Sequence, residues 1–248
     1  MKEISMLLCV VAILLMGCGN ERTNGKEGYN GETKEEAATN EKLGTMKDYD
    51  GNTYKTVKIG KQEWMAENMR ATHDRDGNTI ALGSETSYDK PYRYCPDDNS
   101  ANVKKYGYLY NWAAAMKVCP MGWHLPTDEE WKKLEMEVGM SWSEADGERW
   151  RGDIAAKLCA DGGWSTSTEP NAAGNRSASD RNASGFSSLP AGSYDGGYYG
   201  FGVTAIFRSA TENGDGYAYG RLLGYSQAGV YRATGKKNYG GAVRCVRD

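Results

Sequence analysis

The sequence predicts an α+β domain in which two helices stand among many short strands joined by glycine-rich turns. The 248 residues are 39% hydrophobic and 25% charged, which is the composition of a globular protein. Glycine is abundant at 32 residues, and the aromatic side chains are 17 Tyr and 7 Trp against only 3 Phe, which favours turn-rich β-structure. Only two stretches show the periodicity of an amphipathic helix.

The net charge of the chain limits the classes of binding partner that we expect. The formal net charge is −3 and the sequence pI is about 5.6. A nucleic-acid-binding domain normally carries a basic surface, so we expect no nucleic-acid partner. Only 2 His are present, which excludes a His-rich metal site, and the sequence contains no HExxH or P-loop pattern.

The first 44 residues predict an export signal and a tether. The apolar run from Ile4 to Met16 is as long as a signal-peptide core and too short to cross a bilayer as a helix. Leu15-Met16-Gly17-Cys18 resembles a bacterial lipobox, which predicts removal of residues 1–17 as a lipoprotein signal peptide and lipidation of Cys18. A plain secretory signal is the alternative. Residues 18–44 are polar and predict a flexible tether. We therefore expect a lipoprotein of the bacterial cell envelope, at the outer membrane or cell surface, that meets the membrane through its lipid alone.

The folded domain is expected to span residues 45–248 and to open with β-hairpins. Thr53–Ile59 alternates in polarity, Gly60 and Lys61 supply a turn, and Gln62–Met65 is a second short strand. Asp48, Asp50 and Asn52 are spaced like the start of a calcium loop. The twelfth position of such a loop would be Ile59 and not glutamate, so we interpret the segment as a hairpin turn.

Two helices are predicted in the middle of the chain. The first is Tyr106–Val118, ended by Cys119-Pro120, with an apolar stripe formed by Leu109, Trp112, Ala113 and Met116. The second begins after Thr127, because Thr127 and Glu130 have the spacing of a capping box. Its buried stripe is expected to be Trp131, Leu134 and Val138, and Gly139 is a natural stop.

The last third of the chain is divided by glycines into short strands. The expected strands are Gly185–Leu189, Gly202–Ser209, Tyr217–Leu223, Val230–Arg232 and Gly241–Arg247. Before them, Asp161–Ala183 has no periodicity and is rich in Ser, Asn, Gly and Asp. It predicts a long loop, and such loops often carry function.

Four cysteines remain once Cys9 and Cys18 are assigned to the signal and the lipid. In an exported domain they predict disulfides, with three possible pairings, and the zinc alternative lacks any CxxC spacing. We favour the pairing of Cys119 with Cys245 and of Cys95 with Cys159.

Three groups of motifs, taken in order, resemble the Fibrobacter succinogenes major paralogous domain over nearly all of residues 45–248. The opening reads Asp50-Gly51-Asn52-x-Tyr54-x-Thr56-Val57-x-Ile59-Gly60-x-Gln62-x-Trp64-Met65-Ala66-Glu67-Asn68. The middle reads Tyr106-Gly107-x-Leu109-Tyr110-x-Trp112 and then Cys119-Pro120-x-Gly122-Trp123-His124-Leu125-Pro126. The end reads Gly185-Phe186-Ser187-x-Leu189-Pro190-Ala191-Gly192 and then Val243-Arg244-Cys245-Val246-Arg247-Asp248.

The resemblance implies a C-type-lectin-like fold, with two helices packed on small twisted antiparallel sheets and long loops. It also implies that Cys119 pairs with Cys245. The family has no established catalytic residues, so the resemblance supplies none. Members often carry a further cysteine shortly before the Tyr-Gly motif, where this chain has Val103-Lys104-Lys105.

The candidate ligand-binding residues lie in or beside glycine-rich loops. Flat amphipathic rings suit sugar faces and protein surfaces, and those available are Trp164, Tyr194, Tyr198 and Tyr199. Ordinary packing is the alternative reading of these rings. Glu169-Pro170-Asn171 matches a C-type-lectin tripeptide that binds calcium and sugar hydroxyls through hard oxygen ligands, although the usual Trp-Asn-Asp companion is missing.

These observations predict a binding domain for a glycan or a surface ligand, without catalysis. We expect no cofactor and no metal, with calcium at Glu169 and Asn171 as the lesser alternative. The second functional hypothesis is a structural or adhesion protein of the envelope with a protein partner.

Overall fold

A computed structural model describes residues 43–248. The predicted signal peptide, the lipidated Cys18 and residues 18–42 of the predicted tether lie outside the described residues. In the described part of the chain no helix is long and apolar enough to span a bilayer.

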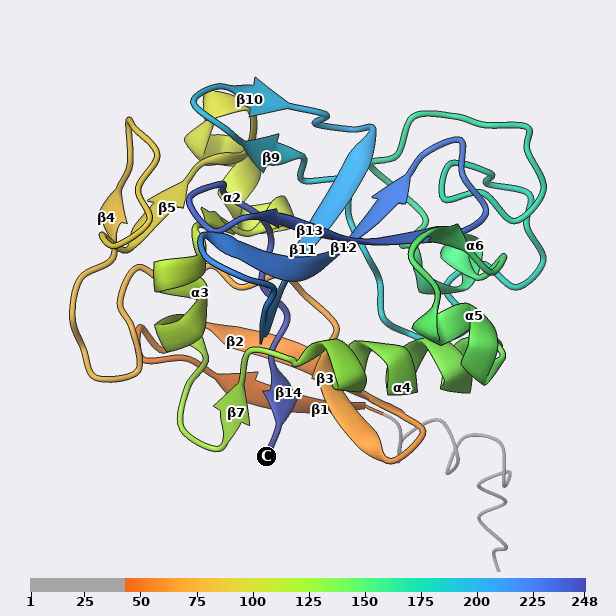
Figure 1. Cartoon of the computed structure of the whole chain (residues 1–248), viewed down its shortest axis with the longest axis horizontal. Coiled ribbons are helices and arrows are strands. Elements are labelled where there is room, and N and C mark those ends of the chain that lie inside the picture. Colours follow the sequence, from red (N-terminus) through yellow and green to blue (C-terminus); the bar gives the residue numbers. More distant parts are fainter. Residues whose placement is uncertain (1–42) are drawn as a thin grey trace, which may run out of the picture.

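A five-stranded antiparallel sheet forms the lower part of the molecule in Figure 1, in the order β1-β2-β3-β14-β7. Its strands are β1 (Leu43–Lys47), β2 (Thr53–Ile59), β3 (Gln62–Met65), β7 (Trp123–His124) and β14 (Val246–Arg247). The predicted hairpin is therefore confirmed as β2 and β3. Leu43 and Gly44 pair with β2, so they belong to the sheet and not to the tether in which the sequence placed them.

The turn between β1 and β2 is held by Asp48. Its carboxylate accepts hydrogen bonds from the backbone N–H and side-chain amide of Asn52, at 2.9 and 2.8 Å, and from the hydroxyl of Tyr54 at 2.5 Å. The carboxylate oxygens are thus used by the turn itself, as the sequence interpretation expects.

The helices and the 3₁₀ turn among the described residues are short, apart from one. They are η1 (Pro96–Asp98), α2 (Ser100–Tyr106), α3 (Trp112–Val118), α4 (Asp128–Val138), α5 (Trp142–Asp146) and α6 (Ala155–Leu158). The second predicted helix is confirmed as α4, capped by Thr127 and Glu130 through reciprocal hydrogen bonds and ended at Gly139.

The first predicted helix is wrong in its N-terminal half. Gly107, at φ 74°, ends α2, and Leu109 and Tyr110 form the short strand β6. The helix α3 begins only at Trp112, because the side chain of Asn111 caps it by accepting from the N–H of Ala114. Its buried face is therefore Ala114, Ala115 and Val118 and not the predicted stripe.

A four-stranded antiparallel sheet lies above the first one in Figure 1, in the order β11-β12-β13-β8. Its strands are β11 (Thr204–Glu212), β12 (Tyr217–Gly224), β13 (Val230–Lys236) and β8 (Arg149–Arg151). A hairpin of β9 (Ser193–Tyr194) and β10 (Tyr198–Tyr199) lies at its edge. In a small third sheet, β4 (Ala81–Leu82) runs parallel to β5 (Tyr92–Tyr94), which pairs with β6 (Leu109–Tyr110).

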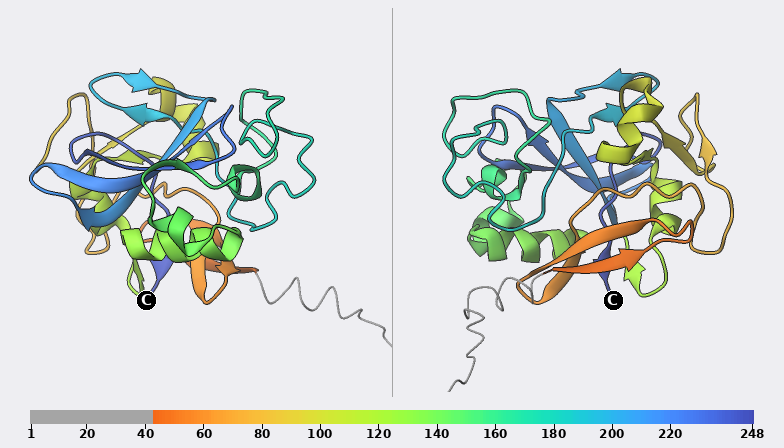
Figure 2. Two further views of the ribbon diagram at one scale, coloured as in Figure 1. Left: turned by 45° about the vertical axis from the view of Figure 1, so that its right-hand side comes forward. Right: turned by 180° about the vertical axis from the view of Figure 1, so that it is seen from behind.

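Three of the late predicted strands are confirmed as β11, β12 and β13. Gly185–Leu189 is not a strand, because Gly185 and Ser187 have φ values of 72° and 55°, which extended backbone does not allow. Of Gly241–Arg247, only Val246 and Arg247 form a strand. The segment Asp161–Ala183 is a loop, as predicted, and lies beside α6 in both Figure 1 and Figure 2. The observed fold is α+β with curled, mostly antiparallel sheets.

The main core lies between α4, the lower sheet and the inner face of the four-stranded sheet. Trp64 of β3 and Trp131 of α4 meet with ring centroids 4.8 Å apart, and Phe186 and Phe207 pack against them. Large aromatic side chains thus join the two sheets through the helix.

Buried charges also fasten α4 to the four-stranded sheet. We call Asp128, Glu135, Arg151, Arg221 and Arg232 the inner-face ion network. Arg221 reaches Asp128 and Glu135, each at 2.7 Å. Arg151 pairs with Glu135 at 2.6 Å, and Arg232 with Asp128 at 2.7 Å. Burial opposes ionisation of Asp128, but the hydrogen bonds and charges of Arg232 and Arg221 hold its pKa below the usual value.

Cys119, at the end of α3, forms a disulfide with Cys245, just before β14, 126 residues later. This pairing confirms the one that the family resemblance implies. The predicted pairing of Cys95 with Cys159 is wrong, since both thiols are free and buried. Cys159 follows α6 and belongs to the main core, whereas Cys95 precedes η1 on the side of Tyr198. Burial raises the pKa of both thiols.

Candidate ligand-binding site

The four-stranded sheet has two unlike faces. Side chains alternate along a strand, and the register pairs Ile206 with Leu222 and Leu222 with Tyr231 on the outer face. The inner face, which carries Phe207 and Arg221, packs on the main core and on α4. The outer face has no helix packed over it in Figure 1 or Figure 2.

A cavity of about 320 Å³ lies on the outer face, and we call it the sheet groove. Small residues make its centre, because Gly220 of β12 pairs with Ala233 of β13 and both line the cavity. A Cβ atom added at Gly235 would meet no heavy atom within 4 Å, so the groove is open above this position. The cavity therefore arises because the middle of the sheet carries glycine and alanine, whereas the surrounding positions carry larger side chains.

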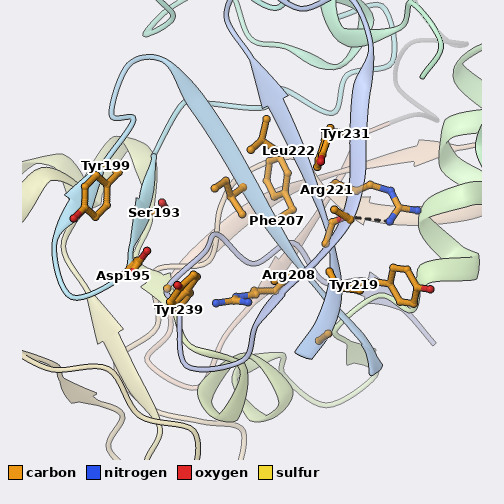
Figure 3. Close-up of a pocket in the computed structure, with 17 residues that line it drawn as sticks. Ser193, Asp195, Tyr199, Phe207, Arg208, Tyr219, Arg221, Leu222, Tyr231 and Tyr239 are labelled. Carbon is orange, nitrogen blue, oxygen red and sulfur yellow. Dashed lines mark hydrogen bonds between the residues drawn. The ribbon is translucent and has the colours of Figure 1, made fainter. Parts of the chain in front are cut away.

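Aromatic rings and a few polar groups form the walls of the sheet groove (Figure 3). Tyr199 of β10 is 59% exposed at one side. Tyr231 lines the opposite side and packs edge-on against Trp150 of β8, with ring centroids 5.1 Å apart. Tyr239 lies beyond the end of β13, with the ammonium group of Lys236 5.6 Å from its ring centroid. Ser193 and Asp195 of the β9–β10 hairpin complete the wall.

Arg208 of β11 also lines the sheet groove, and its guanidinium group points toward Tyr239 in Figure 3. The residue is only 5% exposed. Burial lowers the pKa of its side chain to about 10. The group therefore remains protonated at neutral pH, although its environment disfavours the charge.

The structure separates the four aromatic residues that the sequence singled out. Trp164 is 2% exposed, and its indole N–H donates to the carbonyl oxygen of Ser188 at 3.1 Å. Tyr194 is 4% exposed and stacks on Tyr94, with centroids 3.9 Å apart. These two rings are packing residues and were wrongly predicted to face a ligand. Tyr198 is half-buried against Tyr194, so only Tyr199 lines the sheet groove.

Glu169 and Asn171 lie in the long loop and do not line the sheet groove. The side-chain amide of Asn171 donates to the carboxylate of Asp153 at 3.5 Å, and Asn171 itself adopts φ 56°. Across residues 43–248, no three His, Cys, Asp or Glu side chains form a group that could hold a metal ion. The tripeptide thus folds as a turn within the loop.

Both histidines lie outside the sheet groove and bind carboxylates. The ring of His124 lies between Glu130 and Asp248, at 2.8 and 2.6 Å. Burial opposes its charged form, but the hydrogen bonds with Asp248 and Glu130 outweigh this effect and raise its pKa above 6.5. His73 pairs with Asp50. The contacts of His124 with Asp248 and of His73 with Asp50 join segments distant in the sequence and agree with structural roles.

Sequence reasoning missed most of the residues that line the sheet groove. The signal was present in the predicted strand Gly202–Ser209, where Ile206 and Arg208 alternate with Phe207 and so share one face. The sequence does not show which face of the four-stranded sheet is buried, because that depends on where α4 and the lower sheet lie.

Comparison with known proteins gives one match. The model of the Fibrobacter succinogenes major domain matches residues 57–247. No curated protein and no solved structure matches the chain. The matched segment holds the sheet groove, the disulfide and the inner-face ion network, and it covers more than half of the sequence. This chain belongs to the Fibrobacter succinogenes major domain family.

Proposed function

We propose that this protein is a lipid-anchored, non-catalytic binding domain of the bacterial cell envelope that takes a glycan in the sheet groove. The proposal includes the C-type-lectin-like fold that the family resemblance implies. The anchoring and the location rest on the lipobox-like sequence that ends at Cys18 and on the polar segment after it.

The observation that carries the proposal is an open groove with a small-residue centre and aromatic walls. Ligand sites are concave, mostly apolar and lined by aromatic rings together with a few polar groups that fix orientation. Gly220 and Ala233 leave room for a flat ring above the strands, while Tyr199 and Tyr231 stand on either side. A sugar has an apolar face and a polar edge, and both would find matching groups here.

The first test is a glycan-array screen of the exported chain, followed by titration of the best ligand. We expect Tyr199→Ala to weaken binding about five- to tenfold, because the exposed ring would lose its contact with the sugar. The melting curve should not change, since Tyr199 is 59% exposed.

Tyr49→Ala is the matched control, because Tyr49 is 60% exposed but does not line the sheet groove. It should leave binding intact. Repetition in EDTA should also leave binding intact, since aromatic contacts need no metal. No binding to a broad array would overturn the glycan proposal. If one envelope protein then co-purified with the wild type but not with Tyr199→Ala, the alternative of a protein partner would replace it.

A further inference from the structure

Arg208 differs from the other buried arginines among the described residues, which are Arg151, Arg221, Arg232 and Arg244. Three of these pair with carboxylates in the inner-face ion network. Arg244 has no carboxylate, but its guanidinium group donates to the side chain of Asn68 and to the carbonyl oxygens of Met65, Phe186 and Ser187. All four thus have their donors met by the protein.

The guanidinium group of Arg208 has one hydrogen bond within residues 43–248. Its Nη1 donates to the carbonyl oxygen of Lys236 at 3.1 Å, and the group enters no ion pair there. Nε is enclosed without a partner. Nη2 has no acceptor either, but it is not among the enclosed atoms. Nη2 is therefore the unused donor that the sheet groove can reach, whereas Nε stays enclosed beside Gly241.

The position of Arg208 is fixed by its neighbours. A Cβ atom added at Gly241 would lie 3.3 Å from Nε and 3.5 Å from Cγ, so the side chain rests directly on this glycine. The register of β11 with β12 sets its direction, because Arg208 pairs with Gly220, which has no side chain to fill the adjacent space. Arg208 is thus held in one place before any ligand arrives, which reduces the entropy lost on binding.

The surroundings of Arg208 supply no counter-charge. Tyr94 is the ionisable residue whose charge would affect the pKa of Arg208. Burial raises the pKa of Tyr94, so its hydroxyl stays neutral. Asp195 lines the sheet groove but is exposed and forms no ion pair with Arg208. Lys236 adds a second positive charge beside Tyr239. A buried charge without a partner is costly, and a ligand anion would remove that cost.

We infer that the sheet groove selects glycans that carry a carboxylate, such as a uronic acid, and that Arg208 binds this carboxylate. The inference rests on the proposed function and names its ligand class. A carboxylate accepts two parallel hydrogen bonds from a guanidinium group, and here they would come from Nη2 and from the second hydrogen of Nη1, which already donates once to the carbonyl oxygen of Lys236. The sugar ring would then lie over Gly220 and Ala233 with its acidic end toward Tyr239, where Lys236 adds attraction.

The test uses ligands in matched pairs. The exported chain is titrated with oligosaccharides of glucuronic or galacturonic acid and with their methyl esters, which keep the sugar ring but remove the charge. We expect the acid to bind at least about tenfold more tightly than its ester, and the preference to shrink as salt is raised. This comparison needs no variant, so it holds even if a substitution at Arg208 prevents folding.

Two variants then assign the preference to Arg208. In Arg208→Met the acid should bind no better than the ester, and Arg208→Lys should restore only part of the preference, because an ammonium group cannot bind the carboxylate with two parallel hydrogen bonds. Tyr199→Ala should weaken the binding of acid and ester by the same factor. Arg247→Met, at an exposed arginine outside the sheet groove, should change neither affinity.

The outcomes separate the two proposals. If acid and ester bind equally well to the wild type and Tyr199→Ala weakens both, the carboxylate inference is overturned and the glycan proposal stands. If neither ligand nor any neutral glycan binds, the proposed function itself fails. If the acid is preferred but Arg208→Met keeps the preference, another residue binds the carboxylate and the role assigned to Arg208 is wrong.

Discussion

Arg221 and Arg208 lie on neighbouring strands of one sheet, yet only Arg221 pairs with carboxylates. Arg221, on the inner face of β12, has a fully buried side chain and two carboxylates at 2.7 Å. Arg208, on the outer face of β11, is nearly as buried and has no carboxylate. The comparison teaches that burial alone does not give an arginine its role. The paired residue holds α4 to the sheet, whereas the unpaired one has donors without an acceptor in the described part of the protein.

The same contrast extends to the packing of the two faces. The inner face presents Phe207, Leu223 and Val230 to the main core. The outer face presents Gly220, Ala233 and Gly235 at the corresponding centre of the sheet, and a cavity results. Both faces belong to the same strands, so the difference between them lies in side-chain volume.

The largest expected effect on stability comes from removing a carboxylate that pairs with the inner-face arginines, so that they become as poorly paired as Arg208. Glu135→Gln removes the carboxylate that Arg151 and Arg221 share, at 2.6 and 2.7 Å. Three arginines would then face one aspartate in a buried site. We expect the free energy of unfolding to fall by about 3–5 kcal/mol, the usual cost of breaking a buried ion pair. Chemical denaturation followed by tryptophan fluorescence measures it.

Glu63→Gln is the control for this substitution. Glu63 pairs with Arg247 at 2.8 Å, but the arginine side chain is 63% exposed. Solvent screens such a pair, so the loss should be at most about 1 kcal/mol. Equal losses in the two variants would show that the inner-face ion network is no more important than a surface contact.

His124 provides a smaller effect that depends on pH. Its pKa in the fold is raised above the value of 6.5 by Asp248 and Glu130, despite the opposing effect of burial. A raised pKa means that the folded state binds the proton more tightly than the unfolded state. The resulting stability is present in full below pH 6.5 and is lost as the pH rises through the folded-state value.

The measurement compares the wild type with His124→Gln at pH 6 and at pH 8.5. The wild type should exceed the variant in denaturation midpoint at pH 6, and the gap should narrow at pH 8.5. The comparison between two proteins at each pH cancels the titration of all other groups. A gap that is constant or widens with pH would contradict the assigned role of the two carboxylates.

Local sequence signals predicted much of the fold. The capping box at Thr127, the stop at Gly139 and the hairpin of β2 and β3 depend on neighbours in the chain, and all three are confirmed. The first helix was placed six residues too early, because apolar spacing outweighed Gly107 and Asn111. Here the better signals were again local, since a glycine with positive φ and a capping asparagine set the boundaries.

The site was predicted poorly because it depends on long-range packing. Trp164 and Tyr194 stand in glycine-rich sequence, yet the fold covers both rings. Arg208 and Arg221 look alike in the sequence, and only the position of α4 gives one of them its carboxylates. The free thiols of Cys95 and Cys159 likewise reflect distance in the fold, which spacing along the chain does not report.

The smallest expected effect on stability, and the sharpest test of the comparison, is that of Arg208→Met. The substitution removes a charge whose environment already lowers its pKa to about 10, and it leaves no carboxylate behind. Methionine fills a similar volume over Gly241 and forfeits one hydrogen bond, to the carbonyl oxygen of Lys236. These two effects oppose each other, so the free energy of unfolding should stay within about 1 kcal/mol of the wild type or exceed it.

A loss as large as that of Glu135→Gln would place Arg208 among the residues that hold the fold together, and the two faces of the sheet would no longer differ in kind. A stable Arg208→Met protein, by contrast, would show that the fold carries this buried charge without depending on it. Natural sequences seldom retain a buried, poorly paired charge that the fold does not need. The presence of Arg208 at this position would then point to a ligand, and the acid–ester titration shows whether that ligand carries a carboxylate.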